Sequence, residues 1–225
     1  QFVVYLTCAR LGIIVSPLPF QYREHELKHV LSRTRAKAVI TCRRIGNHEH
    51  AAMFSALGTV RLHQISVYAF SMHGGLLPEG ALALDLRMSQ AVDGTKLDHY
   101  LSHIQVSAND VFSICWTSGT EAMPKGVPRS HNEWLVLGPT AIESANLEQG
   151  CRMLCPFPLV NMAGISVGLC AWLLLGATVV QHQPFNLEIF IEQLRTERIE
   201  YTMAPPAILA QLLHREDLVK GIDFA

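Results

Sequence analysis

The loop that runs from Trp116 to Val127 carries the residue types that bind phosphate. It reads Trp-Thr-Ser-Gly-Thr-Glu-Ala-Met-Pro-Lys-Gly-Val, with three hydroxyls, two glycines and one lysine. Backbone N–H groups, O–H donors and an ammonium group are the donors that a polyphosphate needs. The loop is not a Walker A loop, because Pro124 occupies the second glycine position and Gly126 replaces the Ser or Thr after the lysine. The residue types therefore predict phosphate binding by a loop of another kind, rather than a plain solvated turn.

Two regular elements are expected to hold this loop in place. A strand is predicted over 110–116, and the loop itself over 117–128. Ser130 and Glu133 form a capping box that opens a helix immediately afterwards. The loop is thus expected to join the end of a strand to the start of a capped helix.

The segment His25–His29 matches the H-E-x-x-H pattern of zinc proteases. It lies in an amphipathic helix predicted over 22–34, whose apolar face is formed by Leu27, Val30, Leu31 and Thr34. At 100° per residue both histidines lie on the opposite face, so we expect them to point into solvent. Glu49 is a conceivable third ligand, but we predict no metal site.

The segment Gly164–Gly168 matches the G-x-S-x-G nucleophile elbow of hydrolases, with Ser166 as the nucleophile. An elbow needs a strand directly before the serine, and residues 161–163 are a poor strand end. Glu188 and His214 follow in the order of a catalytic triad. An α/β serine hydrolase is therefore an alternative to small residues that pack at the start of a buried helix.

The six cysteines predict reduced, buried thiols. None forms a C-x-x-C pair, and most lie inside apolar runs. Cys151 and Cys155 have the spacing of two metal ligands on a helix, but no further His or Cys clusters near them. Because no signal peptide is visible either, we expect a cytoplasmic protein.

The composition excludes several classes of protein. Hydrophobic residues make up 49% of the 225 residues and charged residues 16%, against about 25% charged in an average soluble domain. Such a chain is not intrinsically disordered. Its net charge of −1, without a basic run, excludes binding of nucleic acid by bulk electrostatics. The composition leaves the oligomeric state open.

The hydrophobic pattern alternates between helical and strand spacing, which is typical of a parallel α/β sheet. Helices are predicted over 1–11, 22–34 and 48–57, and from 130, 187 and 206 onward. Strands are predicted over 13–15, 38–41, 60–67, 110–116 and 199–203. Residues 71–108 are weakly patterned and predict a long excursion with little regular structure.

Residues 153–187 contain no Asp, Glu, Lys or Arg, and the stretch is long enough to span a bilayer. Prolines and glycines interrupt it, and no basic cluster flanks it. The segment 173–180 has the pattern of a helix end, a glycine cap at Gly176 and a β-branched strand. We therefore predict a buried helix and strand, and no membrane span.

The loop resembles the phosphate-loop signature of the adenylate-forming enzymes, commonly T-S-G-[ST]-T-G-x-P-K-G-V. The matching residues are Thr117, Ser118, Gly119, Thr120, Pro124, Lys125, Gly126 and Val127. Glu121 and Ala122 depart from the usual Thr-Gly, a variant associated with some acyl-CoA synthetases. Similar segments occur along the chain, at 10–18, 22–27, 36–38, 158–164 and 201–206.

The resemblance implies an α/β fold of layered, mostly parallel β-sheets flanked by helices. Residues 1–225 would be an incomplete portion of the family's large N-terminal domain, truncated at both ends and without the C-terminal domain. The family joins ATP and a small carboxylic acid into an acyl-adenylate and pyrophosphate, and then passes the acyl group to a thiol, usually that of coenzyme A. The fragment alone is expected to be inactive, because the family's adenine segment, ribose-binding Asp and adenylation lysine are not found.

The resemblance also assigns roles to individual residues. The ATP phosphates would be held by Thr117, Ser118, Gly119, Thr120, Lys125 and Gly126, with Lys125 catalytic and Mg²⁺ bridging phosphate oxygens. Asn161, where the family usually has His, and Gly164 would border the acid pocket. Asn161 could instead cap the buried helix, and Glu121 is expected to point out of the loop. The alternatives to a ligase fragment are the Ser166 hydrolase and a non-catalytic nucleotide-binding module.

Overall fold

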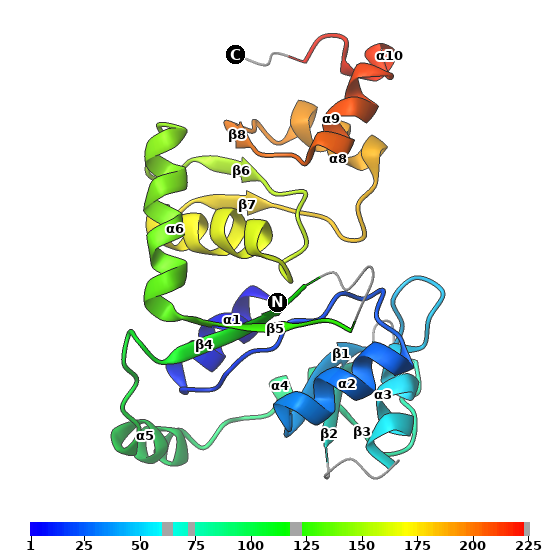
Figure 1. Ribbon diagram of the computed structural model, residues 1–225, viewed down its shortest axis with the longest axis vertical. Coiled ribbons are helices and arrows are strands. Elements are labelled where there is room, and N and C mark those ends of the chain that lie inside the picture. Colours follow the sequence, from blue (N-terminus) through cyan, green and yellow to red (C-terminus); the bar gives the residue numbers. More distant parts are fainter. Residues whose placement is uncertain (60–64, 72–74, 118–122, 223–225) are drawn as a thin grey trace. The chain divides into compact units, whose positions relative to one another are not determined.

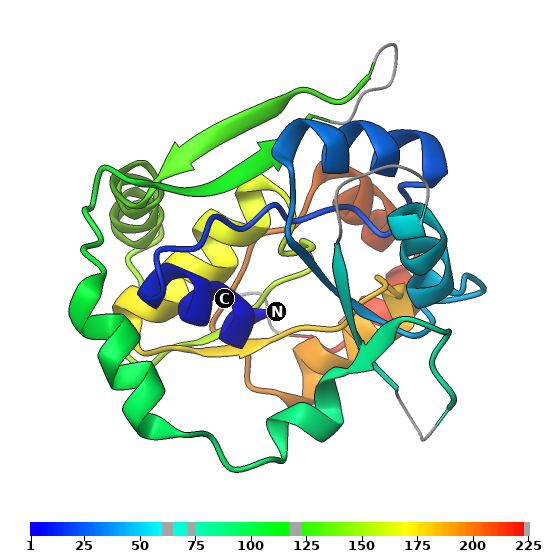
Figure 2. The ribbon, with the colours of Figure 1, turned by 90° about the horizontal axis from the view of Figure 1, so that it is seen from below.

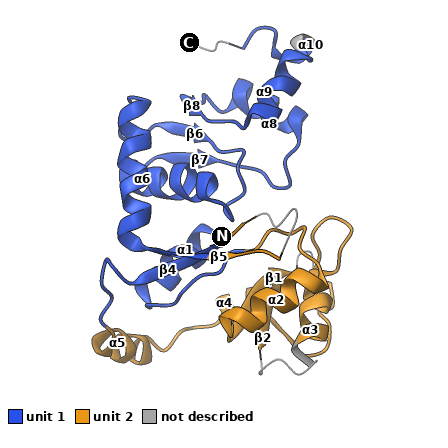
Figure 3. Ribbon diagram, viewed as in Figure 1, with its two compact units in different colours: residues 1–17, 105–115, 127–225 blue, residues 18–104, 116–126 orange. Residues whose placement is uncertain are grey.

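The chain divides into two compact units (Figure 3). The computed structural model describes residues 1–59, 65–71, 75–117 and 123–222. The first unit contains residues 1–17, 105–115 and 127–225, and the second contains residues 18–104 and 116–126. The candidate phosphate loop, apart from Val127, therefore belongs to the second unit.

The second unit is built on a parallel sheet with the strand order β1-β2-β3. The strands are β1 (Ala38–Cys42), β2 (Ser66–Phe70) and β3 (Ala81–Ala83). Parallel neighbours need a crossover connection, and α3 (His50–Thr59) supplies the one between β1 and β2 and packs on both (Figure 1). Two short helices follow β3, α4 (Leu84–Met88) and α5 (Gly94–His103).

Helix α2 (Glu24–Thr34) is anchored to this unit by one face. Its N-terminus is closed by Glu26, whose carboxylate accepts the Arg23 N–H at 2.9 Å, and the acidic first turn suits the positive end of the helix dipole. Its apolar face packs into a buried cluster that contains Leu27, Val30, Leu31, Phe54, Leu57 and Val67. Trp116, the last residue of β4, packs against the same cluster.

The first unit holds two further sheets. Strands β4 (Val111–Trp116) and β5 (Gly126–Ser130) form a two-stranded sheet, and Figure 2 shows their arrows running in opposite directions. The other sheet is parallel in the order β7-β6-β8, made of β6 (Arg152–Leu154), β7 (Thr178–Val180) and β8 (Tyr201–Thr202). The last residue of β4 and the first of β5 lie in the second unit, with the loop between them.

Helices flank the strands of the first unit (Figure 1). They are α1 (Phe2–Arg10), α6 (His131–Ser144), η1 (Gly164–Cys170), α7 (Ala171–Leu175), α8 (Leu187–Thr196), α9 (Pro206–Leu213) and α10 (Glu216–Val219). Segment η1 has wider helical turns than an α-helix and runs directly into α7, so the two form one helix, which is mostly buried along η1 but about half exposed at Leu173 and Leu174.

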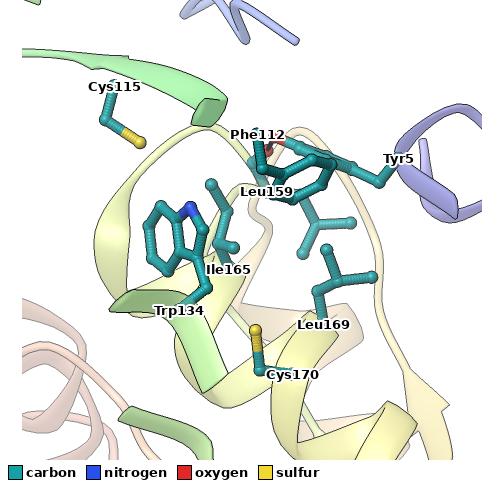
Figure 4. Close-up of a cluster of buried hydrophobic side chains, with 8 residues drawn as sticks. All are labelled: Tyr5, Phe112, Cys115, Trp134, Leu159, Ile165, Leu169 and Cys170. Carbon is teal, nitrogen blue, oxygen red and sulfur yellow. Dashed lines mark hydrogen bonds between the residues drawn. The ribbon is translucent and has the colours of Figure 1, made fainter. Parts of the chain in front are cut away.

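A buried cluster ties α1, β4, α6 and η1 together (Figure 4). The Trp134 indole donates to the Ser113 hydroxyl at 2.7 Å, and the Tyr5 hydroxyl donates to the Leu159 carbonyl at 2.5 Å. Burial raises the pKa of Tyr5 far above its usual range, so this hydroxyl stays a neutral donor. The polar tips of both aromatic rings are therefore satisfied inside the core.

Several local predictions are confirmed. Ser130 and Glu133 form the predicted capping box, with Ser130 N–H donating to the Glu133 carboxylate at 2.7 Å and Glu133 N–H to the Ser130 hydroxyl at 3.2 Å. Helix α7 ends at Gly176, whose φ of +57° suits glycine, and the β-branched strand β7 follows. Pro206 begins α9.

Among the described residues, no helix is both long and apolar enough to cross a bilayer.

Three predictions about strands and loops are wrong. Residues 13–15 make only one bridge, from Val15 to Ser113, and Ile13 and Ile14 are about half exposed. The stretch 71–108 is not irregular, since it contains β3, α4 and α5. Residues 126–130, expected partly as loop, pair as β5, where Pro128 is tolerated because a two-stranded sheet leaves N–H groups free on its outer side. The strand predicted over 60–67 begins at Ser66 in the described chain.

Candidate functional site

The neck of the candidate phosphate loop is the point where the chain leaves β4 and returns to β5. Thr117 N–H donates to the Lys125 carbonyl at 3.1 Å, and Lys125 N–H donates to Thr117 Oγ1 at 3.1 Å. These two bonds place Thr117 directly opposite Lys125. Of the predicted phosphate ligands, the structure therefore brings together Thr117, Lys125 and Gly126, whereas Ser118, Gly119 and Thr120, like Glu121, lie outside the described residues.

Lys125 has the setting of a cation available to a ligand. It is exposed, while Pro124 directly before it is buried. Among the described residues, no carboxylate forms an ion pair with the Lys125 ammonium. The Thr117 hydroxyl accepts from Lys125 N–H and keeps its own proton to donate. An exposed ammonium and an O–H donor, carried by two residues that face each other across the neck, fit a phosphate oxygen.

Two side chains of the α2 region contact the neck. The Tyr22 hydroxyl donates to the Thr117 carbonyl at 3.1 Å. His29 Nε2 lies 3.1 Å from the Pro124 carbonyl oxygen, and its ring meets Trp116 edge-on with the centroids 6.1 Å apart. Burial raises the pKa of Tyr22, with the nearby Glu26 carboxylate adding to the effect. The expectation that both histidines point into solvent is thus wrong for His29 and confirmed for His25, which is exposed.

Asn161 caps the buried helix of the first unit. Its Oδ1 accepts the Gly164 N–H at 2.9 Å, and its carbonyl accepts the Ile165 N–H at 3.1 Å. The capping alternative is therefore confirmed as a structural role for Asn161. Gly164 packs so tightly that an added Cβ would stand 2.1 Å from the Pro158 carbonyl oxygen. Only glycine fits there without moving backbone.

Ser166 does not form a nucleophile elbow. The strand β6 ends at Leu154, and the chain turns into the buried helix at Met162, so no strand leads into the serine. The Ser166 hydroxyl is directed back to the Ala163 carbonyl at 3.5 Å. The geometry of the hydrolase alternative, a sharp strand-to-helix turn that exposes the serine, is thus contradicted.

The other candidate ligands are also occupied or isolated. Glu49 pairs with Arg43 at 3.2 Å and with Arg44 at 3.8 Å. Within the described ranges, no three His, Cys, Asp or Glu residues gather closely enough to hold a metal ion. All six cysteines are free thiols, and burial raises the pKa of Cys155 and of Cys170 to about 11. Such thiols are unreactive at neutral pH.

Comparison with known proteins identifies the family. The model of the AMP-binding enzyme family matches residues 1–223. The chain belongs to the AMP-binding enzyme family, as the loop signature indicates.

The curated relatives that it matches include acid–CoA ligases. The chain is 27% identical to a mitochondrial medium-chain acyl-CoA ligase of Macaca fascicularis, over 96% of this chain and 37% of the relative. It is 26% identical to an indoleacetate–CoA ligase of Aromatoleum aromaticum, over 92% of this chain and 38% of the relative. The chain thus spans less than two fifths of the length of these two relatives.

Solved structures show the same fold. An O-succinylbenzoate coenzyme A synthetase from Bacillus subtilis, in complex with ATP and magnesium ion, matches with a TM-score of 0.71 at 18% identity, over 95% of this chain and 38% of that one. The N-terminal domain of FACL13 from Mycobacterium tuberculosis matches with a TM-score of 0.69 at 18% identity, over 99% of this chain and 50% of that one. The expected α/β fold of an N-terminal domain with parallel sheets is confirmed.

Proposed function

We propose that this chain is the phosphate-holding part of an ATP-dependent acid–CoA ligase. The complete reaction converts a carboxylic acid and ATP into an acyl-adenylate and pyrophosphate, and then transfers the acyl group to coenzyme A. The observation that carries the proposal is the neck of the loop, where the exposed Lys125 lies opposite the Thr117 hydroxyl. Membership of the family and the acid–CoA ligases among the relatives support it.

The chemistry explains why such a neck is useful. The carboxylate attacks the α-phosphorus of ATP, and negative charge accumulates on the leaving pyrophosphate. An ammonium and an O–H donor that are already in place stabilise this charge more in the transition state than in the ground state. Lys125 supplies the charge and Thr117 the hydroxyl. Ser118, Gly119, Thr120 and Gly126 are proposed to add further N–H and O–H donors.

Mg²⁺, when bound, would neutralise phosphate charge in this reaction. The described residues present a cation and one hydroxyl donor at the neck but no cluster of carboxylates. They fit the phosphates of a magnesium nucleotide better than the metal ion itself. Lys125 is therefore assigned to phosphate oxygens, and no metal ligand is assigned within the described residues.

We further propose that Asn161 and Gly164 border the acid pocket. Asn161 uses Oδ1 to cap the helix, which leaves its amide N–H₂ group available as a donor toward a carboxylate or acyl oxygen. Asn161 is exposed, as a substrate-contacting residue must be. Because an amide does not titrate, Asn161 would orient the acid without carrying a proton.

Residues 1–225 are proposed to form part of a large N-terminal domain and to be inactive without the rest of it. The chain covers less than two fifths of the two ligases compared above, so groups that complete the reaction are expected outside these residues. The activity is accordingly assigned to the complete gene product that contains this chain.

Replacement of Lys125 tests the proposal. In the complete gene product, Lys125→Ala should slow ATP–pyrophosphate exchange by roughly 30- to 1,000-fold, the loss expected when a charge-assisted contact worth roughly 2–4 kcal/mol is removed from the transition state. Lys96→Ala is the matched control, because Lys96 is an exposed lysine of the same unit, with 86% of its side chain accessible. Unchanged exchange in Lys125→Ala would show that the assignment is wrong.

A further inference from the structure

Both sides of the loop neck are bonded to the same helical segment. Tyr22, two residues before α2 begins, holds the carbonyl of Thr117 at the start of the loop. His29, in the middle of α2, lies against the carbonyl of Pro124 at the end of the loop. A carbonyl oxygen only accepts hydrogen bonds, so His29 Nε2 must carry the hydrogen. Two side chains of one segment thus reach both ends of one loop.

Helix α2, which carries His29, is held in place by its buried apolar face. Leu27 and Val30, on either side of His29 along the helix, are 2% and 1% exposed. They belong to the buried cluster that also includes β2 and α3, and Trp116 packs both on this cluster and on the His29 ring. Because α2 is held by its apolar face, its polar side chains present donors at fixed positions.

The contact of His29 acts on Lys125 through a single peptide group. The Pro124 carbonyl and the Lys125 N–H belong to one planar unit. Its oxygen is held by His29 at 3.1 Å, and its N–H is held by Thr117 Oγ1 at 3.1 Å. Thr117 is held in turn by the Tyr22 hydroxyl. The peptide from which the lysine side chain departs is therefore fixed at both of its polar atoms.

We propose that His29 and Tyr22 are positioning residues that align Lys125 and Thr117 for the phosphates of ATP, by holding the two carbonyls of the loop neck. The inference rests on the proposed function, since it needs Lys125 to contact phosphate. Its physical basis is preorganisation: donors that are already oriented need no rearrangement when charge develops. Neither side chain touches the nucleotide in this role.

The primary test replaces His29 in the complete gene product. His29→Leu removes the donor but keeps an apolar group against Trp116, and it should lower kcat of ATP–pyrophosphate exchange roughly ten- to hundredfold, the range for a displaced catalytic group. The KM for the acid and the melting temperature should stay unchanged. His29→Gln retains an N–H donor of similar reach and should recover most of the rate. His25→Leu, on the exposed side of the same helix, is the matched control.

A double-mutant cycle separates positioning from a general structural effect. If His29 acts through Lys125, then His29→Leu should cause little further loss in a Lys125→Ala background. Tyr22→Phe, which removes only the hydroxyl, should behave in the same way with a smaller loss. An equal loss from His29→Leu in both backgrounds overturns the inference. The inference is also overturned if the loss of exchange rate in His29→Leu is fully explained by a smaller fraction of folded protein.

The two proposals fail in different ways. If Lys125→Ala leaves exchange unchanged, the loop does not serve phosphate, and the proposed function itself is wrong. If Lys125→Ala is impaired while His29→Leu matches the His25→Leu control, the phosphate assignment stands and the positioning role is wrong.

Discussion

The loop neck and the start of the buried helix are held by opposite means. At the neck, a few hydrogen bonds join Tyr22 to Thr117, His29 to Pro124 and Thr117 to Lys125, and the Lys125 side chain stays exposed. At the helix start, close packing leaves no room for one added carbon at Gly164. Hydrogen bonds at the neck keep donors accessible to a ligand, whereas close packing at the helix start fixes the position of the backbone. We therefore expect changes at the neck to alter the reaction rate and changes at the helix start to alter stability.

The largest effect is expected at Gly164. An alanine Cβ there would lie 2.1 Å from the Pro158 carbonyl oxygen and 3.2 Å from the Leu159 Cα, both backbone atoms that cannot rotate away. Gly164→Ala should therefore lower the free energy of unfolding by roughly 3 kcal/mol or more, measured by urea denaturation.

Gly94→Ala is the control for Gly164→Ala. Gly94 opens α5, and an added Cβ meets nothing within 4 Å. This change should be neutral or stabilise by up to about 1 kcal/mol. A Gly164→Ala protein as stable as Gly94→Ala would mean that the helix start is not tightly packed, and the contrast with the loop neck would disappear.

A smaller effect is expected from a buried thiol that packs against this helix. Cys155 lies against Gly168, and burial raises its pKa from 9.0 to about 11. Because the folded thiol keeps its proton to higher pH than the unfolded thiol does, its contribution is complete below pH 9 and is lost as the pH rises through 11. Stability should fall by roughly 2–3 kcal/mol across this window for this group.

Cys155→Ala isolates this contribution. The cavity that it leaves costs the same at every pH, so the variant should lose less stability between pH 8 and pH 11 than the unmodified protein does. Urea denaturation at the two pH values measures the difference. Equal losses in both proteins would indicate that the thiol is hydrated in the native state and that the packing there is loose.

Local signals predicted much of the fold. The capping box at Ser130, the glycine at Gly176 and the proline at Pro206 each mark a boundary by backbone chemistry that depends on neighbouring residues only. The short strand β3 was missed because its three residues gain strand structure only by pairing with β2. Residues 13–15 are apolar and β-branched, yet only Val15 pairs with a strand, through its bridge to Ser113.

The sequence names candidate residues for the site but not the side chains that support them. The sequence signature identifies the loop, because hydroxyls, glycines and a lysine are contiguous there. The role of His29 could not be found in this way, since helical periodicity says only which face is apolar. It does not say that a loop almost a hundred residues later returns to the polar side. Two roles remain open for Asn161 from the sequence, because the same side-chain amide can cap a helix or contact a substrate in a pocket.

Replacement of Asn161 gives the smallest effect and separates these two roles. Asn161→Ala removes the oxygen that accepts the Gly164 N–H and should lower the free energy of unfolding by about 1 kcal/mol. Asn161→Asp is the informative partner, because a carboxylate still caps the helix but lacks the N–H₂ donor and repels an acid. If Asn161 borders the acid pocket, Asn161→Asp should keep normal stability while raising the KM for the acid, and leave the KM for ATP unchanged. Normal acid kinetics in Asn161→Asp would restrict Asn161 to the capping role and make the helix start a purely structural region.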